Sequence, residues 1–164
     1  MEQWNIINEI YNLIFLRVNS IKYPSVNISV VINDLCQCVV DRTGQKVIFE
    51  EKQYEPPAMF EMSISVRFEG KNINDLLKAY GEVVVLLKDN PELDIGNYAW
   101  HGSITNKIYL HPIVRNVNHG RIPDCEGLFK YELVYSTEFS INSHKSYEFK
   151  RVEKREIRGI VKEE

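Results

Sequence analysis

The hydrophobic positions along the chain repeat with two different periods, and each period predicts a different kind of element. In residues 2–21, apolar side chains recur every three or four positions, which indicates an amphipathic helix. The same spacing predicts a second helix over about 73–89, capped by Asn72 or Asn74 and ended before Pro91. The apolar stripe of the first helix consists of Trp4, Ile7, Tyr11, Ile14 and Val18, with Ile6, Ile10 and Leu13 beside it. The stripe of the second helix consists of Ile73, Leu76, Leu77, Tyr80, Val83, Val84 and Leu87.

Two long stretches instead alternate apolar and polar residues, which is typical of strands with one buried face. They cover residues 58–68 and 128–141, and a shorter stretch over 26–32 follows the same rule. A one-residue slip would turn every apolar side chain of 58–68 to the other face, so its register should be firmly specified. At roughly 3.3 Å per residue this strand would be about 36 Å long, against a radius of gyration of roughly 15 Å for a compact chain of this size. We therefore expect the strand to bend or to project.

Less regular extended segments lie on either side of the second helix. Residues 35–40 and 47–51 are apolar enough for strands, and the turn-forming residues 41–44 between them predict a hairpin. The segment 107–117 also has a strand pattern. Its Pro112 lacks the N–H that a ladder needs, which predicts an edge strand or a bulge.

A further hairpin turn is predicted at 142–144, where it would connect 128–141 to an extended segment over 145–150. Together these patterns predict an α+β fold. We expect a mixed, mostly antiparallel β-sheet of about five to seven strands, packed by the two main helices over about 2–21 and 73–89.

The chain shows no repeat, low-complexity tract or linker that would divide it. We therefore expect one α+β domain over residues 1–150, followed by a charged C-terminal tail or docking arm over 151–164. From Lys150 to Glu164 there are six basic and four acidic residues, a net charge of +2, and few apolar side chains. A solvated terminus and a docking arm are equally compatible with this composition.

Composition and charge then limit the classes of function. With 164 residues, 44% of them hydrophobic and 26% charged, the chain has the composition of an ordinary folded domain. A net charge of -3 gives no general argument for a protein that coats nucleic acid or a membrane surface. The first residues lack the basic start of a secretory signal, and no apolar stretch is long enough for a membrane span. We expect a cytoplasmic protein or a part of a larger particle.

The cysteines offer the one spacing that suggests metal chemistry. Cys36 and Cys38 are two residues apart, so on a strand they would share a face and could present two thiolates to one ion. No second pair of cysteines exists, and the four histidines are scattered. Because free cysteine is also a common small core residue, core packing is the favoured interpretation, and we expect neither a metal nor a cofactor.

Two loops contain residue types found in active or binding sites. The loop 119–126 holds His119, Cys125 and acidic residues, but catalytic cysteines usually find their base far away in sequence. Tyr98, Trp100 and His101 could stack on a flat ligand, although no lysine or arginine is interleaved with them. The sequence also lacks phosphate-binding glycine loops, H-E-x-x-H and G-x-S-x-G. We therefore do not expect an enzyme.

One part of the sequence resembles a known family. A Pro56-Pro57 pair precedes the long strand, the short turn at 70–72 opens a helix with Leu77-Lys78 near its start, and Asn90-Pro91 ends it. The order of elements before and after this unit is also similar. In this respect the chain resembles the N-terminal domain of the tail terminator, or tube-cap, proteins of contractile injection systems and contractile phage tails. It departs from them in having 86–89 as Leu-Leu-Lys-Asp in place of an aromatic pair, and in lacking a C-terminal extension that some members carry.

The resemblance implies a structural α+β subunit that forms a ring, expected to be a hexamer, at the end of a contractile tail tube or sheath. Such a ring stops further polymerisation of the tube. The implied partners are other copies of the same chain, tail tube and sheath proteins, and neck proteins, with no specific nucleic acid and no membrane. The alternatives are a neck or tail-completion subunit of such a particle, or a cytosolic small-molecule-binding module with a pocket between the helices and the sheet.

An assembly subunit of this kind needs strands or arms that pair with its neighbours. Residues 145–160 are the best candidates for such strand addition, because they follow the last long strand and combine aromatic, apolar and basic side chains. The expected interface residues are Tyr147, Phe149, Arg151, Val152, Arg155 and Ile157.

Overall fold

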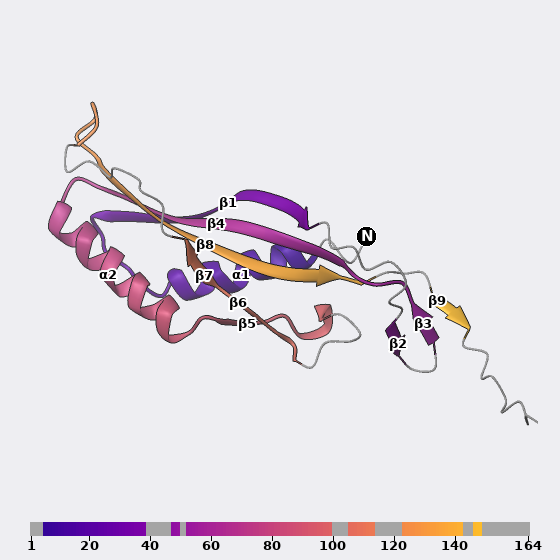
Figure 1. Cartoon of the computed structure of the whole chain (residues 1–164). Helices are drawn as coiled ribbons and strands as arrows, with labels where there is room; N and C mark the ends of the chain where they lie inside the picture. Colours follow the sequence, from indigo (N-terminus) through magenta and orange to yellow (C-terminus); the bar gives the residue numbers. More distant parts are fainter. Residues whose placement is uncertain are drawn as a thin grey trace, which may run out of the picture.

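The structure is a computed structural model that describes residues 5–38, 47–49, 52–99, 105–113, 123–142 and 146–148. The α+β fold predicted from sequence is confirmed (Figure 1). In chain order the elements are α1 (Asn5–Val18), β1 (Val26–Cys38), β2 (Val47–Phe49), β3 (Lys52–Tyr54), β4 (Ala58–Gly70), α2 (Ile73–Asp89), β5 (Glu92–Asp94), the 3-10 helix η2 (Gly96–Tyr98), β6 (Lys107–Tyr109), β7 (His111–Ile113), β8 (Phe129–Ile141) and β9 (Ser146–Glu148).

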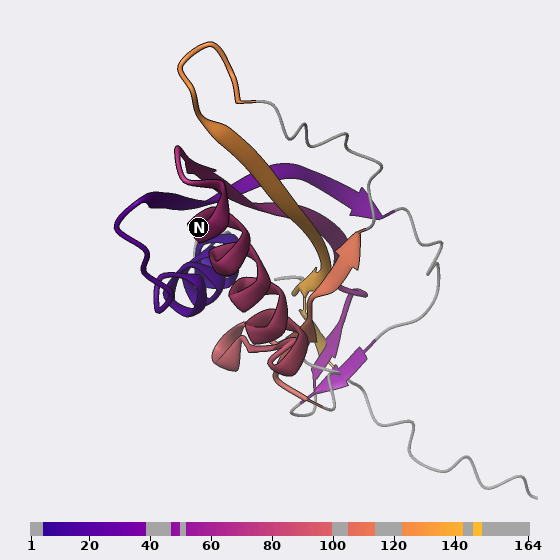
Figure 2. The same cartoon turned by 90° about the vertical axis from the view of Figure 1, so that its left-hand side faces the viewer.

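The main sheet has the strand order β1-β4-β8-β7, and all its neighbouring strands are antiparallel. β4 and β8 pair over their full lengths, from Ala58 opposite Ile141 to Gly70 opposite Phe129. Both helices lie on the same face of this sheet, so the molecule has a sheet layer and a helix layer (Figures 1 and 2). Within the described residues, neither helix is long and apolar enough to cross a membrane.

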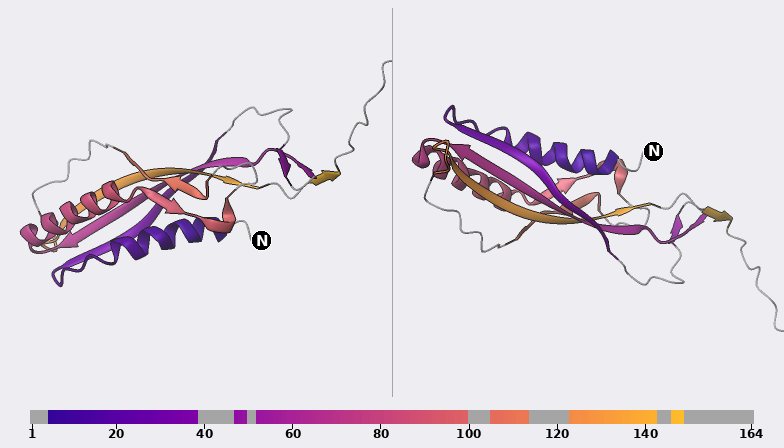
Figure 3. Two further views of the ribbon diagram at one scale, coloured as in Figure 1. Left: turned by 90° about the horizontal axis from the view of Figure 1, so that it is seen from below. Right: turned by 90° about the horizontal axis from the view of Figure 1, so that it is seen from above.

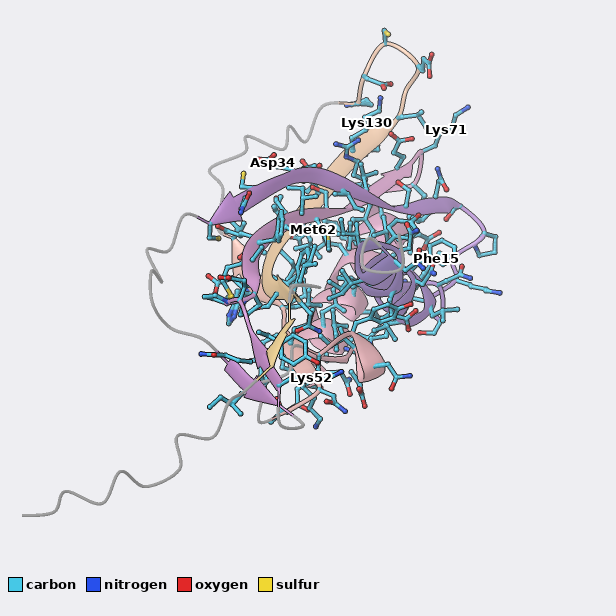
Figure 4. The ribbon with its side chains drawn as sticks, turned by 90° about the vertical axis from the view of Figure 1, so that its right-hand side faces the viewer. Phe15, Asp34, Lys52, Met62, Lys71 and Lys130 are labelled. Atoms are coloured by element: carbon cyan, nitrogen blue, oxygen red, sulfur yellow. The ribbon has the colours of Figure 1, made fainter. Side chains whose placement is uncertain are left out.

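The core lies between these two layers. The alternation predicted for the long strand is confirmed, because Met62, Ile64, Val66 and Phe68 have no exposed surface. Figure 4 shows Met62 among the packed side chains at the centre of the molecule. The side chain of Phe68 packs against Tyr80 of α2 with the two rings tilted, and their centroids are 5.4 Å apart. The helices contribute the buried residues Ile6, Ile10, Ile14, Val18, Leu76, Ala79, Val83 and Leu87.

The buried stripe of α1 differs in detail from the predicted one. Ile6 and Ile10, expected at the side of the stripe, lie in its centre, whereas Ile7 and Tyr11 are half-buried. The helical spacing was predicted correctly, but the centre of the buried face was not. Apolar residues lie on both sides of the stripe, so the sequence does not show which of them is buried most deeply. The helix ends at Val18, where a tight last turn forms between the N–H of Ile21 and the Val18 carbonyl.

The segment from β4 to α2 follows the sequence prediction closely. The side-chain oxygen of Asn72 accepts hydrogen bonds from the backbone N–H groups of Asn74 and Asp75, at 3.0 and 3.3 Å, which caps α2. At the end of β4, a β-carbon on Gly70 would lie 2.7 Å from the carbonyl oxygen of Ser25. A glycine is needed there because β1 begins directly against it.

The predicted early hairpin is wrong. Residues 26–38 form one continuous strand, β1. A bulge at Asn33 shifts the pairing register with β4, and the strand continues beyond it to Cys38. The Asn33 side chain donates to the Ser65 hydroxyl and accepts from Arg67, which fixes the bulge against β4. The short strand β2 pairs instead with β3.

The predicted strand over 107–117 is divided between two sheets within its described part. β6 pairs with β5, and β7 pairs with β8, so the chain changes sheets at Leu110. The N–H of Leu110 donates to the Pro91 carbonyl at 2.8 Å, which holds this crossing. Pro112 lies in β7, at the edge of the main sheet, as its missing N–H predicted.

The hairpin turn predicted at 142–144 is also wrong. β9 does not turn back onto β8 but pairs with β3, whose residue Gln53 lies opposite Tyr147. The pair β3-β9 therefore continues the long pair β4-β8 in the same direction. Together with β2 it forms a second, three-stranded sheet that projects from the body (Figures 1 and 3). We call β2, β3 and β9 the arm.

Candidate functional site

The arm is where the sequence analysis placed the protein interface. Of the expected interface residues, Tyr147 lies in β9 on the arm. The other five, Phe149, Arg151, Val152, Arg155 and Ile157, lie outside the described residues. The structure therefore places the start of the predicted interface segment at the outer end of the arm, while its contacts remain a prediction.

The arm leaves the body at a break in the ladder. Pro56 and Pro57 have no N–H to donate, so the pairing between the two long strands stops at Ala58 and resumes at Tyr54. On the opposite strand, the Asn142 side chain donates to the Ala99 carbonyl at 3.2 Å, which fastens the end of β8 to the body. The projecting part is therefore β3 and its neighbours, whereas the residues 58–68 for which a bend or a projecting end was expected pair with β8 over their whole length.

An apolar side chain of the arm is exposed. The side chain of Ile48 in β2 is 59% exposed, and among the described residues none of the arm belongs to the hydrophobic core. Lys52 of the arm, labelled in Figure 4, is also exposed. Small sheets normally need a hydrophobic face packed on another element to be stable in water. Ile48 thus lies on a part of the arm that the described residues of the body leave uncovered.

The cysteine pair does not occupy the core, contrary to the favoured interpretation. Cys36 is exposed and Cys38 is half-buried, because both lie near the end of β1, where the sheet is no longer covered by the helices. The Cys36 thiol donates to a carboxylate oxygen of Asp34 at 3.3 Å, and this hydrogen bond raises the pKa of the thiol. No group of three potential metal ligands occurs within the described residues.

The polar loop before β8 has a structural role in its described part. The Asp124 carboxylate accepts hydrogen bonds from the backbone N–H groups of Glu126 and Leu128, each at 2.9 Å. It also forms an ion pair with the Lys130 ammonium at 2.9 Å. The Leu128 N–H and the Lys130 ammonium hold the pKa of Asp124 below its usual value. The exposed Cys125 has no base among these contacts. Residues 119–122 lie outside the described residues.

The aromatic group proposed for stacking is not assembled in the described part of the chain. Tyr98 packs half-buried against the core, while Trp100 and His101 lie outside the described residues. The cavity nearest to it has a volume of about 250 Å³ and is lined by Met59, Ile108 and Phe139, among others. Ligand sites usually measure roughly 300–1,000 Å³, so this cavity does not favour the small-molecule hypothesis.

A second surface was not predicted as a site. Leu77 was counted in the buried stripe of α2, but it is 46% exposed, and Val85 is 56% exposed. With Gly81 between them, they line an open groove of about 650 Å³ on the outward side of α2. Their regular spacing of four residues was the available signal, since it sets them on a row beside the buried one.

The overall arrangement can be compared with solved structures. It is similar to the PVC sheath/tube terminator in the cryo-EM structure of an extracellular contractile injection system in its extended state. The fold is terminator-like. The TM-score is 0.57 at 10% sequence identity, and the match covers 85% of this chain and 57% of that terminator chain. The family resemblance noticed in the sequence is confirmed at the level of the fold.

This chain thus spans a little over half the length of the terminator that it matches. No protein-family model matches the sequence, and no curated protein is significantly similar to it. The likeness therefore concerns the three-dimensional arrangement of the helices and strands.

Proposed function

We propose that this chain is a structural subunit of the terminator type, which forms a ring at the end of a contractile tail tube or sheath and stops its polymerisation. The observation that carries the proposal is the terminator-like fold over 85% of the chain. The ring is expected to be a hexamer, with tube and sheath proteins as its further partners. No enzymatic activity is part of this function.

The arm supports an assembly function independently of the fold similarity. It carries the exposed apolar side chain of Ile48 away from the body, and none of its described side chains belongs to the hydrophobic core. A surface of this kind is suited to pairing or packing with a neighbouring subunit. Mixed positive and negative charges on the segment that follows the arm would set the register of such a contact.

The test is the mass of the protein in solution, by light scattering at several concentrations, with and without purified tail tubes. We expect a closed ring near six times 19.2 kDa, or binding confined to the ends of the tubes as seen by electron microscopy. Binding along the whole tube would contradict a cap. A monomer indifferent to tubes would contradict the proposed function altogether.

A shortened chain tests the contribution of the C-terminal segment. If residues 145–160 hold subunits together, a chain that lacks 150–164 should fold but no longer assemble. Circular dichroism would verify the fold, and light scattering would measure the assembly. Normal assembly of the shortened chain would exclude this segment as the main contact.

A further inference from the structure

The groove on α2 is an apolar surface that the fold itself does not use. α2 buries one row of side chains against the sheet and leaves Leu77 and Val85 largely exposed on another. The apolar part of the lining also includes Ile21, from the connection after α1, and Leu86. An exposed apolar row on an amphipathic helix costs solubility, so it is typically kept where a partner binds.

Gly81, in the middle of this groove, has no explanation within the described structure. A β-carbon added there would meet no atom within 4 Å, whereas one on Gly70 would meet the Ser25 carbonyl at 2.7 Å. Glycine inside a helix is less favourable than alanine by roughly 1 kcal/mol. The missing side chain does have one effect, which is to deepen the groove between Leu77 and Val85. It allows another chain to approach the helix backbone closely.

Hydrogen bonds within the chain fix the two elements that line the groove, α2 and the connection that contains Ile21. The Tyr23 hydroxyl donates to the Glu82 carboxylate, and the Arg17 guanidinium donates to the Asn90 carbonyl at 2.6 Å. These bonds tie α2 to the chain on either side of Ile21. A preformed groove loses little conformational entropy when it is filled, which favours binding.

The C-terminal segment of the chain has the chemistry to fill it. Ile157, Ile160 and Val161 are its last apolar residues, and it carries a net charge of +2. The remaining residues 1–149 contain 14 basic and 19 acidic residues, a net charge of -5. The charged residues of the groove are Lys78, Glu82 and Asp89, so their net charge is also negative. The segment and the groove are therefore complementary in both polarity and charge.

Along a straight path, the segment of the same chain ends short of the groove. β9 ends at Glu148, opposite Lys52, at the other end of the molecule from the start of α2 (Figure 1). From that pair to Gly70 the strands rise by roughly 60 Å, and α2 returns by about 12 Å to reach Gly81. Ile157 and Val161 extend at most roughly 30 and 45 Å beyond Glu148, against the roughly 50 Å required.

We propose that the groove on α2 receives Ile157, Ile160 and Val161 of a second copy of this chain. The inference rests on the proposed function, in which the chain works as a ring. Donor and acceptor are different parts of the chain, so each copy can bind one neighbour and be bound by another. Repetition of such a contact closes a ring when the rotation between neighbours allows it.

The experiment is disulfide trapping between two variants of the full chain, each with its native cysteines replaced by serine. One carries Val85→Cys and the other Ile157→Cys, and the two are mixed and oxidised with and without tail tubes. We expect a linked dimer of twice 19.2 kDa that contains one copy of each variant. Absence of this dimer in both conditions would overturn the proposal, as would an internal disulfide in a doubly substituted chain at high dilution.

Substitutions at Gly81 give a second measurement that does not depend on disrupting the fold. Gly81→Ala should raise the midpoint of thermal unfolding by about 2–4 °C, because the helix gains propensity. Gly81→Gln should lower the yield of the trapped dimer at least tenfold, and Gly81→Ala by less. Asn12→Gln, at an exposed position of α1 outside the groove, serves as the control. Equal dimer yields from Gly81→Gln and the control would overturn the proposal.

Tube binding separates this inference from the proposed function. If the native chain caps tubes and Gly81→Gln does so with unchanged affinity, the groove contact is refuted while the cap remains. If the trapped dimer forms and Gly81→Gln suppresses it, but the native chain ignores tube ends, the groove contact is supported and the cap is refuted.

Discussion

The body and the arm of this protein share one run of strand pairing, because β3 and β9 of the arm continue β4 and β8 of the body. In the body, β4 and β8 lie over two helices, and residues such as Ile64 and Phe68 are completely buried. In the arm, Ile48 of the adjoining strand β2 is 59% exposed, and no helix covers it within the described residues. The described core therefore lies in the body, whereas Ile48 in the arm remains in contact with solvent.

The largest expected effect comes from a change to the body. Phe68→Ala removes a fully buried ring that packs against Tyr80, and should lower the free energy of unfolding by about 3–5 kcal/mol. Urea denaturation followed by circular dichroism measures this loss. A loss below about 1 kcal/mol would mean that the packed face of β4 is not the main source of stability.

A buried tyrosine makes the body sensitive to alkaline pH. Burial raises the pKa of Tyr135 to about 12, above the value near 10 expected in the unfolded chain. Because the folded-state pKa is the higher one, this stabilisation is complete below pH 10 and is lost as the pH rises to 12. The loss should reach about 2–3 kcal/mol.

Thermal unfolding measured across this pH range, with Tyr135→Phe as the comparison, tests the alkaline prediction. The phenylalanine variant should lose less stability between pH 10 and 12 than the native chain. Tyr109→Phe, at a position that is 44% exposed, is the matched control. If both variants follow the native curve, the Tyr135 hydroxyl does not couple to folding.

The two glycines on either side of α2's first turns should respond in opposite directions. Gly70→Ala places a β-carbon against the Ser25 carbonyl and should cost about 1–3 kcal/mol of stability. Gly81→Ala has open space and should stabilise the chain instead. A direct comparison of their unfolding midpoints checks the prediction, which fails if both substitutions shift stability in the same direction.

The smallest effect on stability is expected in the arm. Ile48→Ser should change the free energy of unfolding by no more than about 0.5 kcal/mol, because this side chain is already largely in water. The same substitution at Ile64, which is fully buried, should be strongly destabilising. Differential scanning calorimetry distinguishes the two, and a large loss from Ile48→Ser would show that the arm is part of the folding unit.

Local patterns in the sequence predicted the regular parts of the fold well. The limits of α2 and β8, the cap at Asn72 and the edge position of Pro112 all follow from periodicity, side-chain hydrogen bonding or the missing proline N–H. These properties depend on a few neighbouring residues, so they can be derived before the fold is known.

Pairing between distant strands could not be derived in the same way. Whether residues 145–150 turn back onto β8 or continue to β3 depends on long-range contacts, and a polar turn sequence at 142–144 is compatible with both. For the same reason the exposure of Cys36 and Leu77 was missed. The sequence shows that these side chains are apolar enough for a core, but not which part of the sheet or helix the core covers.

The bulge at Asn33 has a consequence for the behaviour of the protein at high concentration. β1 is an edge strand of 13 residues, and long regular edges are templates on which unrelated chains aggregate. The extra residue interrupts the hydrogen-bonding rhythm between Ile32 and Asp34, and its side chain is tied inward to Ser65. A strand from another molecule could therefore match the hydrogen-bonding register of β1 along only part of this edge. The bulge residue thus reduces the tendency of the exposed edge to aggregate.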